Sequence, residues 1–131
     1  MALGGGGLNM IKVFISQPMQ GRPQDVILKE REVIEVIIKT MFAEQDVYFI
    51  DSFIQGAKDV NPLFCLGHSL MALSKADIAV FAPGWHKSRG CKVEWRCCVE
   101  YGIRTCTIDY GDLKEVANDW SSNRRRSKLL L

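Results

Sequence analysis

Four short apolar runs alternate with segments of helical character, and this alternation limits the fold more than any other feature. The runs are residues 11–16, 47–51, 77–82 and 103–109. The third run is apolar without alternation, which is typical of a strand buried on both faces. Strands that alternate with helices pair in parallel through right-handed crossovers. The sequence therefore predicts an α/β domain: a three-layer Rossmann- or flavodoxin-like fold with a parallel sheet of four or five strands and helices on both faces.

Three helices are expected between the strands, and a last short one over residues 112–120. The first begins near Pro23 and carries a wide apolar stripe, which predicts a well-buried helix. The second begins at Asn61, a good cap that is followed by a proline suited to the first helical position. The third covers about residues 91–101, and Gly102 is placed to end it.

Length and charge bound the domain organisation. The chain has 131 residues, the size of one domain. We expect a flexible glycine-rich segment over residues 1–9, a folded domain over 10–118 and a basic tail over 119–131. The tail holds four of the 17 basic residues and one of the 15 acidic ones, which leaves 13 and 14 in the rest of the chain. A folded domain whose net charge is close to zero does not show the excess of basic residues that is typical of nucleic-acid-binding proteins. The tail either touches an anionic partner or is a solvated end.

Membrane and metal signals are weak. No run approaches the ~20 apolar residues of a membrane span, and the start lacks the basic and apolar regions of a signal peptide. We therefore expect a cytoplasmic protein whose five cysteines are reduced thiols. Cys65 and His68 form a C-x-x-H pair, but structural zinc usually shows paired short spacings. No metal or other cofactor is expected.

Three loops are expected to meet at one crevice, because parallel sheets bind ligands beyond the carboxyl ends of their strands. These loops are "SQPMQGR", "DSFIQG" and "PGWHKSRG", all rich in glycine or polar residues. At the crevice the third helix begins near Gly90, and its free N–H groups favour anions such as phosphate. Ser88 is positioned either to cap that helix or to donate a hydrogen bond to a phosphate oxygen.

Glu94 lies about one turn inside the third helix, within reach of a ligand held at the helix mouth. A carboxylate there can attack a sugar carbon and form a covalent intermediate, as in retaining glycosidases. Such a glutamate has to be ionised and free of a permanent Arg or Lys partner. The alternative is a structural acid, because the helix dipole favours acidic residues in the first turn by about 0.3–1 kcal/mol. Cys91 and Cys98 share its face and are expected to pack around it rather than act as nucleophiles.

Two stretches carry a resemblance to a known family. They are "KVFISQPMQGR", which precedes a long helix, and "ADIAVFAPGWHKSRGCKVEWRCCVEYGI". Together they resemble the nucleoside 2-deoxyribosyltransferase-like superfamily. They are most similar to an uncharacterised bacterial and phage branch with the motifs I-S-(G/Q)-P-M and G-W-x-x-(S/A)-R-G-x-x-x-E. The resemblance covers about residues 11–108. The second motif is the more specific one, since strand, loop, glycine and glutamate follow in the expected order.

The resemblance implies a 2-deoxyribosyltransferase or N-glycosidase, an enzyme that acts at the N-glycosidic bond of a nucleoside or nucleotide. It places the nucleophile on Glu94, the 5′-phosphate contact on Ser88 and the enclosure of the sugar on residues 16–22. It also implies a small-molecule nucleoside or nucleotide as partner. Members are commonly dimers or larger, with a site completed by a neighbour, so we expect at least a homodimer.

Two positions depart from the family pattern. Ser69 stands where the enzymes usually carry an assisting aspartate, and Gln17 replaces a glycine common in their first loop. His68 either replaces the missing acid as a general base or is an exposed helix histidine. These departures favour an alternative function, a catalytically weak module that binds a nucleotide-derived metabolite or signal. A third possibility is an interaction domain with a nearly empty crevice.

The remaining candidates lie in the three loops. Trp85 either stacks on a nucleobase or packs as a lid over the core, and Asp51 can hydrogen-bond ribose hydroxyls. Arg22 and Arg89 are either phosphate partners or surface arginines. The predicted site comprises catalytic Glu94 and His68, with substrate contacts from Ser16, Gln17, Met19, Gly21, Arg22, Asp51, Trp85, His86, Ser88, Arg89 and Gly90.

Overall fold

The computed structural model describes residues 10–52 and 61–116, and these residues form the predicted α/β architecture. The elements along the chain are β1 (Met10–Ser16), α2 (Gln24–Met41), β2 (Asp46–Phe49), α3 (Pro62–Leu73), β3 (Ile78–Phe81), the short 3₁₀ helix η2 (Trp85–Lys87), α4 (Arg89–Tyr101) and β4 (Arg104–Thr107). Residues 110–116 are also helical. The expected flexible segment over 1–9 and the expected basic tail lie outside the described residues.

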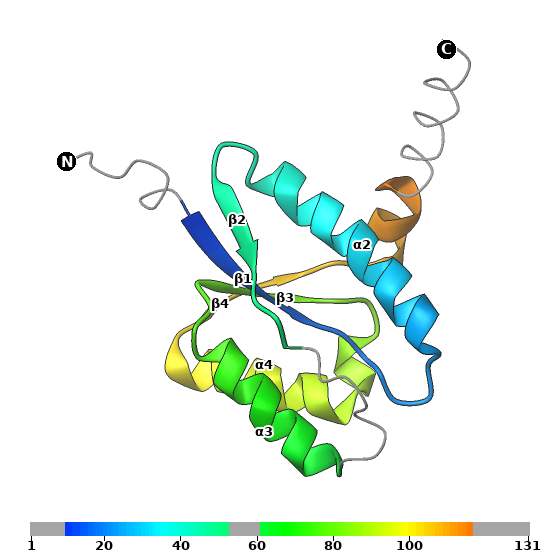
Figure 1. Cartoon of the computed structure of the whole chain (residues 1–131), viewed down its shortest axis with the longest axis vertical. Coiled ribbons are helices and arrows are strands. Elements are labelled where there is room, and N and C mark those ends of the chain that lie inside the picture. The colour runs from blue at the N-terminus through cyan, green and yellow to red at the C-terminus, as the bar shows by residue number, and fades with distance from the viewer. Residues whose placement is uncertain (1–9, 53–60, 117–131) are drawn as a thin grey trace, which may run out of the picture.

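The four strands form one parallel sheet in the order β2-β1-β3-β4 (Figure 1). From β1 the chain moves to β2 on one side, then returns past β1 to β3 on the other. The strand order therefore reverses between β1 and β3, which is where open parallel sheets hold their ligands. The last residue of β1, Ser16, is paired in register with Phe81 of β3. No fifth strand is present in the described part of the chain.

Helices cover both faces of the sheet, α2 on one side and α3 with α4 on the other (Figure 1). Successive strand residues point to opposite faces, and β1 follows this rule. Val13 and Ile15 pack in the cluster that includes Ile34 of α2. Phe14 packs in the second cluster, which includes Cys98 of α4. The same alternation sends the side chain of Ser16 towards α4.

Local sequence signals fix the ends of the two helices on the second face. Asn61 caps α3, because its side-chain oxygen accepts a hydrogen bond from the N–H of Phe64 at 2.7 Å. Ser88 caps α4, which therefore begins at Arg89 and not at the expected residue 91. Gly102 ends α4 in the left-handed conformation, with φ of 72°. Both predicted caps and the predicted stop are confirmed.

Helix α2 is less buried than its apolar stripe predicts. Ile27, Ile34 and Ile38 are buried, but Val26 and Met41 are 46% and 48% exposed within the described part of the chain. Apolar residues occupy more of the helix circumference than one sheet face can cover. The expectation of a well-buried helix is therefore wrong for the outer part of the stripe. No helix among the described residues is long and apolar enough to cross a bilayer.

Candidate functional site

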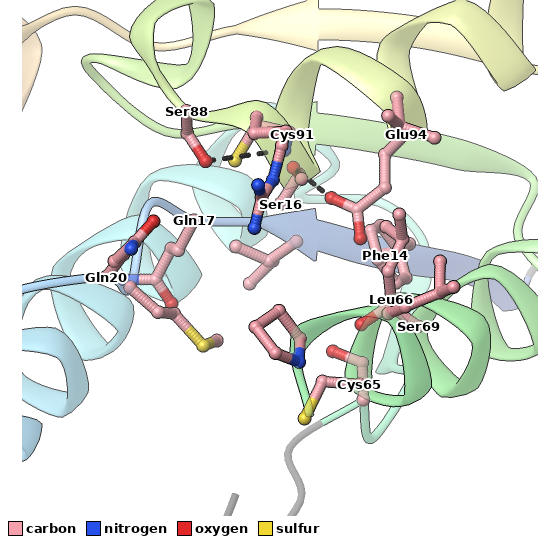
Figure 2. Close-up of a pocket in the computed structure, with 18 of the residues that line it drawn as sticks. Phe14, Ser16, Gln17, Gln20, Cys65, Leu66, Ser69, Ser88, Cys91 and Glu94 are labelled. Atoms are coloured by element: carbon pink, nitrogen blue, oxygen red, sulfur yellow. Dashed lines mark hydrogen bonds between the residues drawn. The ribbon is translucent and has the colours of Figure 1, made fainter. Parts of the chain in front are cut away.

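A cavity of about 740 Å³ lies beyond the carboxyl end of β1, at the reversal of strand order (Figure 2). The end of β1 and the loop that follows it form one wall. The first turns of α3 and the N-terminal half of α4 form the others. In Figure 2, Gln17 and Gln20 lie on one side of this space and Cys65, Leu66 and Ser69 on another. The volume is in the range of small-molecule sites, about 300–1,000 Å³.

Part of the site predicted from the sequence is brought together at this cavity. Seven predicted residues line it: Ser16, Gln17, Met19, Ser88, Arg89, Gly90 and Glu94. Six others do not line it in the described part of the chain: Gly21, Arg22, Asp51, His68, Trp85 and His86. The residues brought together come from the end of β1 and the start of α4.

Glu94 lines this cavity, and the residue is only 7% exposed. The hydroxyl of Ser16 donates a hydrogen bond to its Oε1 at 2.6 Å (Figure 2). Among the described residues, no Lys or Arg lies within ion-pair distance of it. Burial raises the pKa of Glu94 from 4.5 to about 7, and the Ser16 hydrogen bond opposes this rise only in part. The carboxyl is therefore charged in about half of the molecules at neutral pH.

Packing alone gives no reason for a glutamate at position 94. The residue lies on the buried stripe of α4, between Cys91 and Cys98, as the spacing predicts. An apolar side chain there would avoid the free-energy cost of burying a carboxylate. Burial raises the pKa of the Cys91 thiol and raises that of Cys98 to about 11, so both stay protonated at neutral pH. Of these three side chains, only the carboxyl group therefore ionises near neutral pH.

The N-terminus of α4 forms the next part of the cavity wall. The oxygen of Ser88 accepts the N–H of Cys91 at 3.4 Å, so Ser88 does cap the helix (Figure 2). Arg89 and Gly90, the first residues of α4, line the cavity. A Cβ added at Gly90 would meet no atom within 4 Å, so the glycine leaves open space in front of the helix end. Such a helix end is suited to an anion.

Arg22 has a different place from the one expected for a phosphate partner. Its guanidinium pairs with Glu30 at 2.9 Å and donates to the carbonyl of Pro18 at 2.7 Å. Gly21 is at a turn with φ of 74°, a conformation that favours glycine. Both residues therefore shape the loop after β1 and do not line the cavity.

Trp85 packs on the core and not at the cavity. Its ring stacks on Trp95 with centroids 4.3 Å apart, and it contacts the ring of Phe81 at 5.4 Å. These contacts agree with the second of the two roles predicted for Trp85, a lid that packs over the core. His86 is exposed and meets the edge of Trp85, with ring centroids 5.9 Å apart.

His68 is exposed on α3 and does not line the cavity, whereas its neighbour Ser69 does. The described geometry therefore does not bring an imidazole to Glu94. Asp51 is exposed just after β2. Within residues 10–52 and 61–116, no three His, Cys, Asp or Glu side chains gather closely enough to hold a metal ion.

Sequence reasoning placed only His68 and Ser69 of α3 near the site and missed the apolar part of the wall that this helix forms. Pro62, Cys65 and Leu66 line the cavity, and so does Phe14 from inside β1. A signal was available, since α3 directly follows a loop that was expected at the crevice.

No protein-family model matches this chain, and no curated protein matches it. The cavity geometry and the two motifs are therefore what supports a function.

Proposed function

We propose that the chain acts at the N-glycosidic bond of a nucleoside or nucleotide, with Glu94 as the nucleophile. One observation carries the proposal: a buried carboxyl group faces a cavity without a cationic partner among the described residues. Burial opposes the ionisation of this carboxyl group and so raises its pKa. Ionisable groups in a cleft whose pKa is shifted in this way are typical of functional sites. The resemblance to the 2-deoxyribosyltransferase-like superfamily points to the same residue.

The proposed reaction has two steps. The free carboxylate oxygen of Glu94 attacks C1′, the bond from C1′ to the base nitrogen breaks, and the base leaves with that electron pair. A glycosyl ester of Glu94 results. Water then attacks C1′ and restores the carboxylate, and the proton that it loses balances the one taken up by the base. A second base in place of water gives transfer. The hydroxyl of Ser16 holds the other carboxylate oxygen in place.

The rest of the cavity accounts for binding. A phosphate or the sugar hydroxyls contact Ser88, the side chain of Arg89 and the first N–H groups of α4. The base contacts the apolar wall formed by Pro62 and Leu66 of α3, in the role that the sequence gave to Trp85.

Base release tests this function. The protein is incubated separately with 2′-deoxynucleosides, ribonucleosides and their 5′-monophosphates, and free base is measured by chromatography. We expect release from at least one of these classes, and exchange when a second free base is added if the enzyme is a transferase. Absence of release from every class, at protein concentrations that give measurable binding, would rule out the proposed chemistry.

A second candidate function is a binding module for a nucleotide-derived metabolite or signal. Ser69 favours it, because this hydroxyl lines the cavity where the resemblance expects an assisting carboxylate. Glu94 is the one acidic side chain among the described residues that line the cavity. In this role a neutral Glu94 donates a hydrogen bond to the ligand. Tight binding by calorimetry together with no base release would support this candidate.

The proposed nucleophile predicts a pH profile. Because burial raises the pKa of Glu94 to about 7, the ionised fraction rises from roughly one tenth at pH 6 to nine tenths at pH 8. We expect kcat/KM for an unphosphorylated nucleoside to rise about tenfold over this interval. The unphosphorylated substrate keeps the titration of phosphate out of the profile. A rate that falls over the same interval would show that the protonated form of Glu94 is the active one.

The homodimer or larger oligomer implied by the resemblance stays a prediction. It gains support from α3, which has no charged residue in its sequence "PLFCLGHSLMAL". Leu63, Phe64 and Met71 of this helix are 77%, 60% and 70% exposed. Leu63 also lines the cavity, so a second copy packed on α3 would lie beside the ligand.

A further inference from the structure

Glu94 presents one of its two carboxylate oxygens to the cavity. The hydroxyl of Ser16 donates to the first, Oε1, at 2.6 Å. The second, Oε2, accepts no hydrogen bond from the described residues, and it is not sealed from solvent as the amide oxygen of Gln17 is. In Figure 2 the carboxyl group points from α4 towards the space between β1 and α3. A ligand in the cavity can therefore reach Oε2.

The surroundings of this carboxyl group favour a ligand that carries a positive charge. Phe14, Leu66 and Val93 give the cavity wall an apolar part, and burial opposes the ionisation of Glu94 and raises its pKa. No Lys or Arg of the described residues pairs with it. A cation within about 4–6 Å stabilises a carboxylate. A cationic ligand therefore supplies the counter-charge that the described part of the fold does not.

The leaving base adds a second electrostatic requirement. When its bond to C1′ breaks, the base takes the electron pair, and an uncharged base then needs a proton from a general acid. Besides Glu94, the described cavity wall holds three ionisable side chains, those of Arg89, Cys65 and Cys91. Arg89 does not release its proton, and thiols are weak donors. A base bonded to C1′ through a positively charged ring needs no proton, because the electron pair makes it neutral.

We propose that the substrate is a nucleoside or nucleotide whose base is a cation, with the positive charge on the ring bonded to C1′, as in a pyridinium or an N7-alkylated purine. The proposal rests on the proposed function, which brings C1′ to Oε2 of Glu94. Reacting atoms are about 3–3.5 Å apart in such complexes, so the ring nitrogen on C1′ lies within about 5 Å of this oxygen. The charged ring and the carboxylate then form a pair within the apolar cavity.

The reaction balances without a general acid. Oε2 of Glu94 attacks C1′, the bond from C1′ to the ring nitrogen breaks, and its electron pair cancels the positive charge of the base, which leaves as a neutral molecule. Water then attacks C1′ of the glycosyl ester, and the bond to Oε2 breaks and restores the carboxylate. The water gives its proton to the solvent, whereas an uncharged base would have taken it up.

Binding at two pH values tests the charge pair without turnover. The carbocyclic analogue of nicotinamide riboside keeps the pyridinium charge, and a CH₂ group in place of the ring oxygen prevents cleavage. Benzamide riboside has a ring of the same shape without the charge. Calorimetry compares each ligand with itself at pH 6 and pH 8, between which the ionised fraction of Glu94 rises from about one tenth to nine tenths. The cation should bind about five- to tenfold more tightly at pH 8, and benzamide riboside should not bind more tightly.

Two variants identify the group responsible for the pH dependence. Glu94→Gln should remove the pH dependence of cation binding, because glutamine does not titrate. Glu100→Gln is the matched control on the same helix, since the Glu100 side chain is 53% exposed, and it should keep the full dependence. The comparison of the two ligands in the unaltered chain does not depend on the folding of either variant.

The other ionisable groups around Glu94 are separated from it in this design. The thiols of Cys91 and Cys98 flank it on α4, and burial raises the pKa of both, so they keep their protons between pH 6 and pH 8. Arg89 stays charged. Cys65 lies on the opposing helix α3, and a titration of its thiol would persist in the Glu94→Gln protein.

Turnover of paired substrates tests the leaving base. Nicotinamide riboside carries the charge on a pyridine and 7-methylguanosine carries it on a purine, and guanosine is the uncharged match of the second. Released base is measured by chromatography and divided by the release without protein. We expect this rate enhancement to be at least about tenfold larger for one of the charged substrates than for guanosine. The substrate that responds identifies the kind of base.

The outcomes separate the charge of the base from the chemistry of Glu94. Release of guanine from guanosine with an equal or larger enhancement, or cation binding that does not change with pH, overturns the cationic base and leaves the covalent mechanism intact. Cation binding that depends on pH through Glu94, in a protein that releases no base, supports recognition of the cation and overturns the mechanism. Absence of both binding and release overturns both.

Discussion

Replacing Glu94 by glutamine is expected to lower the rate of base release by at least about 10³-fold, the order of loss seen when a nucleophile is removed. Glutamine has nearly the same shape and keeps an oxygen that can accept the hydrogen bond from Ser16. The cavity should therefore keep its form, and the dissociation constant for the nucleoside should stay within about threefold. Single-turnover base release and calorimetry measure the two quantities separately.

Glu100→Gln is the control for this experiment. Glu100 lies on the same helix, but its side chain is 53% exposed and pairs with Arg96 at 2.9 Å. Its replacement should leave base release unchanged. If Glu94→Gln retains more than about a tenth of the original rate, Glu94 does not form the covalent intermediate.

The second large effect concerns stability, since Glu94→Gln should also be more stable than the original protein above pH 7, by up to about 3 kcal/mol. Burial raises the pKa of Glu94 from 4.5 to about 7, so the folded state keeps its proton to a higher pH than the unfolded chain does. The contribution of this group to stability is therefore complete below pH 4.5, is lost as the pH rises from 4.5 to 7, and changes little above pH 7. The two pKa values differ by about 2.5, and each unit is worth about 1.4 kcal/mol.

Urea denaturation at pH 5 and pH 8 measures this change. Glutamine does not titrate, so the stability of the variant relative to the original protein should grow between these two values. Glu100→Gln again serves as the control, and its stability difference should be nearly the same at both. A gap between Glu94→Gln and the original protein that does not change with pH would mean that the carboxyl is not buried as the structure shows.

Much of the fold could be predicted from local patterns in the sequence. The runs that became β1 and β3 are apolar and short, and Asn61 and Gly102 have side-chain or backbone properties that set helix ends by themselves. Such features depend on residues within one or two turns of each other.

Sequence reasoning identified the residues at the cavity whose positions are set by the ends of strands and helices. Ser88, Gly90 and Glu94 sit at fixed spacings from the start of α4, and all three line the cavity. The environment of Glu94 was not predictable, because it depends on Ser16, 78 residues away in the sequence. Trp85 shows the same limit, since its contact with Trp95 arises only when η2 folds back on α4.

Gln17 illustrates what sequence reasoning cannot supply even for a residue that does line the cavity. Its type marks it as a polar departure in the first loop. Which of its two amide atoms is used by the fold depends on Ile27 and Glu30 of α2. Only the assembled structure shows that the nitrogen is used and the oxygen is not.

The register of β1 with β3 divides the cavity into a fixed part and an adjustable part. Ser16 is held in the sheet opposite Phe81, and Glu94 lies on α4, which packs against the face of the sheet that Phe81 forms. The residues that follow Ser16 belong to a connecting loop, where changes of sequence are tolerated most easily. Changes of sequence in that loop can therefore reshape one side of the cavity, while the pair formed by the Ser16 hydroxyl and the Glu94 carboxyl keeps its geometry.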